Sequence, residues 1–306
     1  MSQSFLFEVR SHHFLTTMRL SAPAKINLHL EVLGRRSDGF HALETVFQTL
    51  DLSDELWVEL THDVGEKATP GAPLINLICS DPTIPADATN LAWRAAAAIL
   101  EQRPTAGRVF ISLTKHIPHG AGLGGGSSDA ASVLMALNAQ LGDPLNEHEL
   151  AEIALLLGSD VPYFLVGGTA HATGRGEELT PLPDMPAMPI TVLMPDAHLP
   201  TPRVFNALTD AERGPRTPRG ATWAAQQSAE KLLHNRLTPA ATRLCPPLGD
   251  LLVWLAQRGV PHLMSGSGAA CFALAHIDPP AGVRAWHTRT GPGARRRNPR
   301  HDPPGT

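Results

Sequence analysis

The sequence predicts an α+β fold, because strand patterns and helix patterns are both present but do not alternate strictly along the chain. Residues 19–32 alternate apolar and polar side chains, which is typical of a half-buried strand. Residues 91–102 are rich in alanine and follow Asn90, which can cap a helix. Residues 129–141 place large apolar side chains on one helical face. With 306 residues, the chain is long enough for two modest lobes.

The remaining elements follow from the same rules. Residues 45–60 predict a strand with a turn at residues 52–54. Asn146 and Glu149 form a capping-box pattern at the start of another helix, and residues 248–257 predict a further one. Short apolar runs predict strands at residues 108–114, 161–166, 169–173, 190–194 and 271–275.

The composition argues against several classes of protein. The formal net charge is −4, which is unusual for a general nucleic-acid binder. No apolar run approaches the roughly 18 residues that span a bilayer. The three cysteines form no CxxC pair, so neither a disulfide framework nor a zinc site is expected. We therefore expect a cytoplasmic protein with a small-molecule substrate, without a nucleic-acid or membrane partner and with no protein partner evident.

A glycine-rich segment precedes the helix predicted at residues 129–141. It predicts a phosphate-binding loop, because glycines let the backbone approach an anion and the helix directs free N–H groups toward it. Ser127 or Ser128 is expected to cap that helix. The candidate nucleotide-binding residues are Pro118, His119, Gly120, Ala121, Gly122, Leu123, Gly124, Gly125, Gly126, Ser127 and Ser128.

Two other interpretations of this segment stay open. It can be a flexible linker, although a proline on one side and a helix on the other argue against that. Gly120, Gly122 and Gly125 also satisfy GxGxxG, the pattern of a dinucleotide-dependent oxidoreductase, but without a clear βαβ unit. No Gly-Lys-Ser/Thr follows, which excludes a Walker-type P-loop.

The glycine segment resembles the phosphate loop of the GHMP kinases. Four further segments strengthen the resemblance, which covers most of the chain: residues 22–28 (APAKINL), 36–41 (RSDGFH), 157–164 (LGSDVPYF) and 265–272 (SGSGAACF). The resemblance implies a ribosomal protein S5 domain 2-like lobe and a ferredoxin-like lobe with the site between them. We place the first lobe at residues 18–180 and the second at residues 181–276, beginning with a proline-rich connection at residues 181–189.

The resemblance also implies catalytic roles. Asp160 matches the family's catalytic aspartate, and a base is needed because a tertiary alcohol is a poor nucleophile. Lys25 matches the catalytic lysine, whose charge favours an ionised Asp160 and offsets charge on the phosphate. Asn27 lies on the same strand face as Lys25 and is expected to bond substrate. Lys115 precedes the loop, and both a nucleotide contact and an ordinary surface position stay open for it.

Phe40 and His41 match the family's cytosine-recognition pair, with phenylalanine where the family commonly has tyrosine. Thr201, with Pro202, and Phe205 resemble another substrate-contact segment. The resemblance therefore implies transfer of the ATP γ-phosphate to the 2-hydroxyl of a cytidyl-diphosphate-linked methylerythritol. We expect Mg²⁺ to arrive with ATP, since no acidic pair dedicated to a metal is evident.

Both ends of the chain depart from this pattern. Residues 1–17 are predicted to be an extension and residues 277–306 a basic Pro/Gly/Arg-rich tail, with a closing strand missing. A disordered tail and a reading-frame shift both explain that tail. Two alternative functions also stay open: a GHMP kinase for homoserine, mevalonate or a sugar, and a non-catalytic GHMP-fold nucleotide-binding protein.

Overall fold

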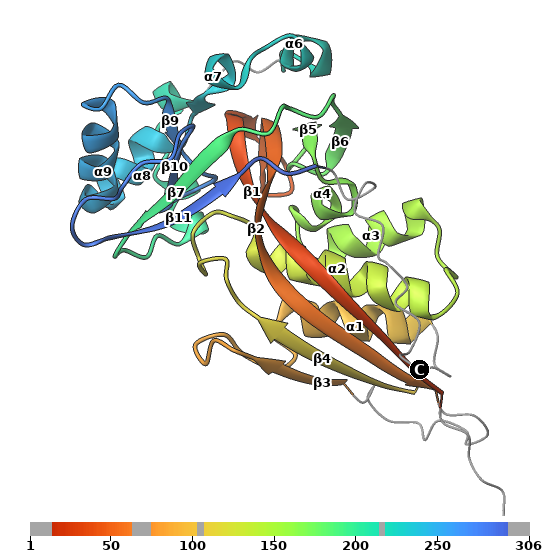
Figure 1. Ribbon diagram of the computed structural model, residues 1–306. Coiled ribbons are helices and arrows are strands. Elements are labelled where there is room, and N and C mark those ends of the chain that lie inside the picture. The colour runs from red at the N-terminus through yellow and green to blue at the C-terminus, as the bar shows by residue number, and fades with distance from the viewer. Residues whose placement is uncertain (1–13, 63–74, 103–106, 214–217, 293–306) are drawn as a thin grey trace, which may run out of the picture.

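The computed structural model describes residues 14–62, 75–102, 107–213 and 218–292 (Figure 1). Its first lobe is built on a long antiparallel hairpin of β1 (Phe14–Arg35) and β2 (His41–His62). The sheet order is β3-β4-β2-β1-β8, and β5 and β6 continue from β2. The remaining strands of this sheet are β3 (Ile75–Cys79), β4 (Arg108–Thr114), β5 (Thr169–Thr173), β6 (Glu178–Pro181) and β8 (His234–Asn235).

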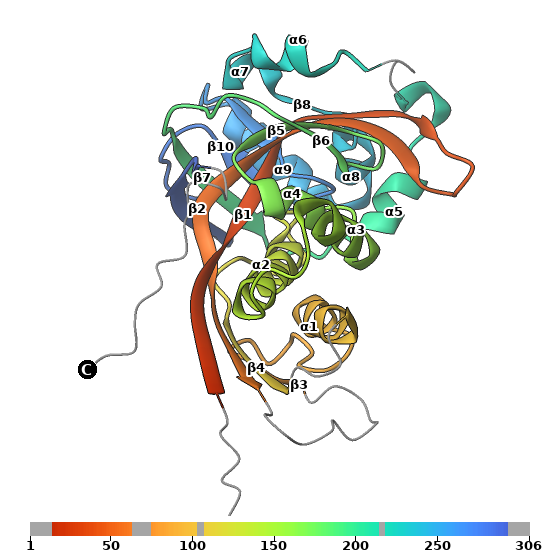
Figure 2. The same ribbon diagram turned by 90° about the vertical axis from the view of Figure 1, so that its right-hand side faces the viewer.

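Helices cover one face of this sheet, as Figure 2 shows. They are α1 (Leu91–Gln102), α2 (Gly125–Gln140), α3 (Glu147–Leu157) and α4 (Val161–Val166). Leu56, Val58 and Leu60 of β2 are buried against Ile99 of α1 and Leu134 of α2 in one core cluster. Burial of such aliphatic side chains, at about 1.5–3 kcal/mol each, is what holds the helices on the sheet.

The second lobe has a four-stranded antiparallel sheet in the order β11-β7-β10-β9. Its strands are β7 (Pro189–Pro195), β9 (His262–Met264), β10 (Cys271–Ala273) and β11 (Val283–Arg289). Around them lie α5 (Thr201–Asn206), a 3₁₀ turn (Asp210–Glu212), α6 (Ala221–Ala225), α7 (Ala229–Leu232), α8 (Thr238–Leu244) and α9 (Pro246–Ala256). The predicted α+β fold in two lobes is confirmed.

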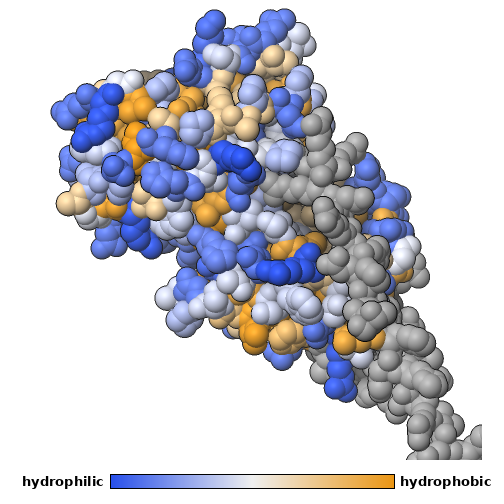
Figure 3. All heavy atoms as spheres, viewed as in Figure 1, coloured by the Kyte–Doolittle hydropathy of each residue, from blue (hydrophilic) through white to orange (hydrophobic). Residues whose placement is uncertain are grey.

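The surface seen in Figure 3 mixes hydrophilic and hydrophobic side chains over both lobes. Among residues 14–62, 75–102, 107–213 and 218–292, no helix is long and apolar enough to cross a membrane.

Three predicted elements of the first lobe were wrong. Residues 161–166 form a helix and not a strand, because Pro162 in the first turn is compatible with a helix and cannot donate in a ladder. The turn at residues 52–54 is absent, since β2 runs through it and only a register shift opposite residues 23–25 marks the place. Helix α2 begins at Gly125, four residues before the predicted start.

The expected ends of the chain also need correction. Residues 14–17 pair with residues 59–62 as part of β1, so the extension does not reach residue 17. The closing strand is present: β11 pairs along its whole length with β7, beyond the boundary expected at residue 276. Gly291 N donates to Thr49 O at 2.8 Å, which ties the end of β11 to the first lobe. Residues 1–13 and 293–306 lie outside the described residues.

Candidate active site

Strand β1 carries a buried lysine into the space between the lobes. Lys25 Nζ donates to Asn27 Oδ1 at 2.7 Å and to the carbonyl oxygen of Gly122 at 2.9 Å. Asn27 in turn donates from Nδ2 to Thr45 Oγ1 at 2.8 Å. The Asn27 amide fixes the ammonium of Lys25 beside the glycine loop, and the expected bond from Asn27 to substrate stays a prediction.

Asp160 faces Lys25 from the start of α4. It occupies the N-cap position, but its side chain makes no capping hydrogen bond. Its carboxylate Oδ2 lies instead 3.6 Å from Lys25 Nζ. Burial lowers the pKa of Lys25, and the attraction of Asp160 opposes that effect. The pair therefore places an accessible carboxylate next to a buried cation.

The glycine loop enters α2 through Gly124, whose φ of 73° is left-handed. Gly124 is the N-cap, so the expected capping by Ser127 or Ser128 was wrong: both serines lie inside the first helical turn. The backbone N–H groups of Gly125, Gly126 and Ser127 belong to that first turn and have no acceptor within the helix. The positive end of a 16-residue helix is thus available to an anion.

Lys115 forms a buried ionic cluster beneath the loop. Its ammonium lies 2.7 Å from Asp129 Oδ2 and also pairs with Asp54. Asp54 Oδ1 accepts the backbone N–H groups of His116 and Ile117 at 2.6 and 2.8 Å. The cluster fixes the segment that leads into the glycine loop against the start of α2.

A second glycine turn, at residues 265–268, approaches the first one from the other lobe. Ser265 Oγ donates to Gly122 O at 3.1 Å. A Cβ at Gly122 would collide with the carbonyl oxygen of Ser265, so only glycine allows this approach. Asn235 of β8 holds the turn by donating to the carbonyl oxygens of Met264 and Gly266, each at 2.8 Å.

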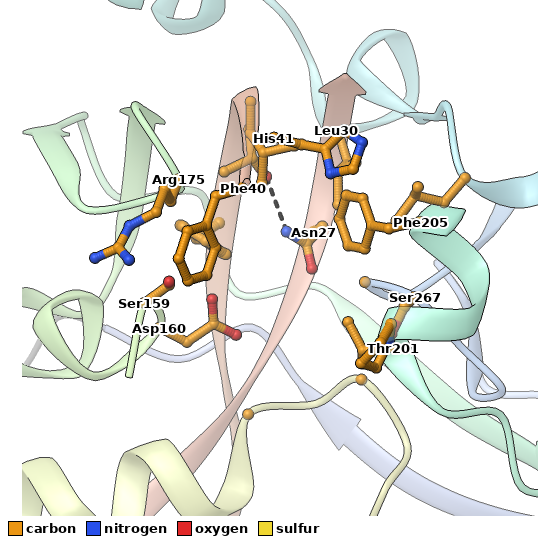
Figure 4. Close-up of a pocket in the computed structure, with 18 of the residues that line it drawn as sticks. Asn27, Leu30, Phe40, His41, Ser159, Asp160, Arg175, Thr201, Phe205 and Ser267 are labelled. Atoms are coloured by element: carbon orange, nitrogen blue, oxygen red, sulfur yellow. Dashed lines mark hydrogen bonds between the residues drawn. The ribbon is translucent and has the colours of Figure 1, made fainter. Parts of the chain in front are cut away.

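These elements enclose a cavity of about 420 Å³ between the lobes. Figure 4 shows Asp160 at one side and the rings of His41 and Phe205 at the far end. These two rings stack with centroids 5.0 Å apart. Burial, helped by Arg213 and Arg35, lowers the pKa of His41, which favours a neutral ring with one donor and one acceptor nitrogen. Phe40 lies on the same side of the cavity as Asp160, and it is 49% exposed.

The structure brings together most of the residues singled out in the sequence. The cavity is lined by Lys25, Asn27, Phe40, His41, Gly122, Gly124, Asp160, Thr201, Pro202 and Phe205. Thr201 Oγ1 is hydrogen-bonded to Ser267 Oγ at 2.7 Å. The other candidate loop residues do not line this cavity: Pro118, His119, Gly120, Ala121, Leu123, Gly125, Gly126, Ser127 and Ser128.

Other lining residues were not candidates in the sequence, among them Phe47, Ser159, Arg175 and Ser267. Ser159 and Ser267 lie within two of the segments that resemble the GHMP kinases, residues 157–164 and 265–272. Their position in these segments was the signal that could have identified them as lining residues. Arg175 stands between two glycines after a predicted strand, a pattern that indicates a tight turn but no contact with the cavity.

A glycine-rich helix start open to an anion and a lysine–aspartate pair, held between two α+β lobes, indicate a small-molecule kinase. Residues 90–168 match the N-terminal domain of the GHMP kinases and residues 222–292 match their C-terminal domain. The chain belongs to the GHMP kinase family, whose members are ATP-dependent phosphotransferases, and the predicted family and fold are confirmed.

Relatives within this family are more specific. The chain is 42% identical to a 4-diphosphocytidyl-2-C-methyl-D-erythritol kinase of Polaromonas sp. (strain JS666 / ATCC BAA-500), over 83% of this chain and 82% of that protein. It is 41% identical to the kinase of that name from Geobacter sulfurreducens, over 84% and 89%. A crystal structure of 4-(cytidine 5'-diphospho)-2C-methyl-D-erythritol kinase is 38% identical with a TM-score of 0.73, covering 90% of this chain and 99% of that one.

A more distant structure shares the fold alone. Homoserine kinase from Cytophaga hutchinsonii is 17% identical with a TM-score of 0.65, covering 95% of this chain and 98% of that one.

Proposed function

We propose that this chain transfers the γ-phosphate of ATP to the 2-hydroxyl of 4-diphosphocytidyl-2-C-methyl-D-erythritol, a step of non-mevalonate isoprenoid biosynthesis. The observation that carries the proposal is a single cavity with two different ends. Asp160 lies at one end, 3.6 Å from Lys25 Nζ, and His41 and Phe205 lie at the other. The relatives named above support the same substrate.

The lysine–aspartate pair supplies the chemistry at the first end. Asp160 takes the proton of the 2-hydroxyl as the new O–P bond forms and the bond from the γ-phosphorus to the bridging oxygen breaks, which releases ADP. Lys25, held by Asn27 and the Gly122 carbonyl, offsets the negative charge that develops on the transferred group. The Lys25 ammonium and the Asp160 carboxylate already lie 3.6 Å apart in the structure, so this chemistry needs no rearrangement of the fold.

The aromatic end selects the acceptor. Phe205 at this end and Phe40 across the cavity from it offer ring faces to a pyrimidine base, and a neutral His41 offers both a donor and an acceptor for the polar edge of the base. Stacking needs only the ring face of Phe40, so the absence of a tyrosine hydroxyl does not remove it. A small alcohol such as homoserine or mevalonate would leave these rings unused.

We place the phosphates of ATP at the start of α2, because the N–H groups of Gly125, Gly126 and Ser127 are available there. Among the described residues, no three His, Cys, Asp or Glu side chains converge on a possible metal position. We therefore assign Mg²⁺ to the ATP phosphates and water, where it supplies charge neutralisation during phosphoryl transfer.

A substrate panel tests the proposal. ATP consumption is measured with the purified chain and 4-diphosphocytidyl-2-C-methyl-D-erythritol, homoserine, mevalonate or galactose as acceptor. We expect turnover with the cytidyl compound and little with the other three. Turnover of another acceptor in place of the cytidyl compound would overturn the substrate assignment, and no turnover of any would favour a non-catalytic nucleotide-binding protein.

A further inference from the structure

A rigid turn between β5 and β6 carries Arg175 to the wall of the cavity. Gly174 and Gly176 have φ of 72° and 109°, which glycine adopts readily. The carboxylate of Glu177 accepts the backbone N–H of Arg175 and lies 3.6 Å from its Nε. Gly174 O accepts the N–H of Leu43 at 2.8 Å, so the turn is fastened to the strand that follows Phe40.

The guanidinium of Arg175 lies over the ring of Phe40, with its Cζ 4.4 Å from the ring centroid. Figure 4 shows the two side chains on the same side of the cavity as Ser159 and Asp160, across from Phe205 and Thr201. The side chain of Arg175 is 22% exposed. A cation therefore sits at the rim of the cavity, supported by an aromatic face on one side and by a carboxylate behind it.

Three lining side chains can carry positive charge: Lys25, His41 and Arg175. The ammonium of Lys25 is occupied by Asn27, the Gly122 carbonyl and Asp160. His41 is stacked on Phe205 and has a lowered pKa, which favours the neutral ring. Within the described part of the chain, the terminal Nη groups of Arg175 have no hydrogen-bond acceptor, so they are available to a ligand.

We propose that Arg175 recognises the diphosphate of the acceptor substrate and so determines specificity for a cytidyl-diphosphate-linked alcohol. The inference rests on the proposed function, because that substrate brings a doubly charged link between its base and its reacting alcohol. A guanidinium donates two parallel hydrogen bonds to phosphate oxygens, and the Arg175 side chain presents them to a ligand by turning away from the Phe40 ring. Without this residue, the described residues that line the cavity offer the diphosphate no uncommitted cation.

Competition by fragments of the substrate tests the proposal. Cytidine and CDP are measured as inhibitors competitive with the acceptor, in the wild-type chain and in Arg175→Met and Arg175→Lys. Losing a charge-assisted contact is expected to raise KM for the cytidyl substrate and Ki for CDP about tenfold or more in Arg175→Met. Ki for cytidine, KM for ATP and kcat are expected to stay near their wild-type values, and Arg175→Lys is expected to recover part of the loss.

A second stacked arginine provides the matched control. Arg258 Cζ lies 3.4 Å from the centroid of the Trp254 ring in the second lobe, and Arg258 does not line the cavity. Arg258→Met is therefore expected to change none of these constants. An equal rise in Ki for cytidine and for CDP in Arg175→Met would overturn the proposal, because Arg175 would then act on the base through Phe40 and not on the diphosphate. An unchanged KM would overturn it as well. Failure of the wild-type chain to phosphorylate the cytidyl substrate would instead overturn the proposed function, and with it this inference.

Discussion

Lys25 Nζ lies 3.6 Å from Asp160 Oδ2, although the two residues come from the middle of β1 and the start of α4. The side chain of Lys25 is only 4% exposed, whereas that of Asp160 is 36% exposed. The buried cation is thus fixed and the carboxylate faces the cavity. This asymmetry suits a division of work in which Asp160 exchanges a proton with the acceptor and Lys25 supplies constant charge.

Asp160→Asn tests that division of work. The amide keeps the size and shape of the carboxylate but accepts no proton, so kcat is expected to fall about 100- to 10,000-fold. ATP affinity is expected to change little, because the proposed site for the ATP phosphates is the start of α2 and not Asp160. Steady-state rates and equilibrium binding of ATP measure the two effects. A variant with near-normal kcat would remove Asp160 from the role of base.

Lys25 and Asp160 show how far sequence patterns can reach. Alternation along residues 19–32 places Lys25 and Asn27 on one strand face, and the family motif supplies their role. The same reasoning misassigned residues 161–166, because six consecutive apolar or aromatic positions have no period that separates a helix from a strand. Asp160, singled out by the family motif, does line the cavity, even though the element that follows it was predicted wrongly.

Tertiary pairing explains the other errors. Residues 283–289 have only weak alternation, and they become a strand because β7 offers a hydrogen-bonding edge along its whole length. Arg175 reaches the cavity because a glycine turn brings it over Phe40, a residue distant in the sequence. Contacts of this kind depend on the assembled sheet, so no local pattern predicts them.

The approach of the two glycine turns predicts a contrast between two alanine substitutions. Gly122 has φ 76°, and a Cβ there would collide with the Ser265 carbonyl, so Gly122→Ala is expected to lose stability and activity together. The left-handed backbone alone costs alanine about 1–2 kcal/mol. Thermal melting and kcat are the measurements.

Gly126→Ala, in the first turn of α2, is the matched control. Gly126 is helical, and the nearest atom to a Cβ there is Leu91 Cδ1 at 3.9 Å. Alanine in a helix is favoured over glycine by up to about 1 kcal/mol, so the melting temperature of this variant is expected to hold or rise. Equal melting temperatures in the Gly122 and Gly126 variants would show that the two turns do not need their close approach.

The cluster around Lys115 predicts a pH dependence of stability. Burial, together with the nearby carboxylate of Asp54, raises the pKa of Asp129 to about 7 against the pull of Lys115. The folded chain therefore holds a proton that the unfolded chain has released above an ordinary pKa of 3.8. The stabilisation linked to this proton is complete below that value, declines as pH rises, and is lost above the folded pKa of about 7.

Asp129→Asn removes this titration. Because the amide stays neutral at every pH, the variant is expected to gain stability relative to wild type as pH rises from 5 to 8, as measured by thermal melting across that range. Glu212→Gln is the control: hydrogen bonds from the Arg243 guanidinium and the Thr209 backbone N–H lower the pKa of Glu212 to about 2, so its difference from wild type is expected to stay constant over this range. Parallel melting curves for wild type and Asp129→Asn would show that Asp129 does not titrate in this window.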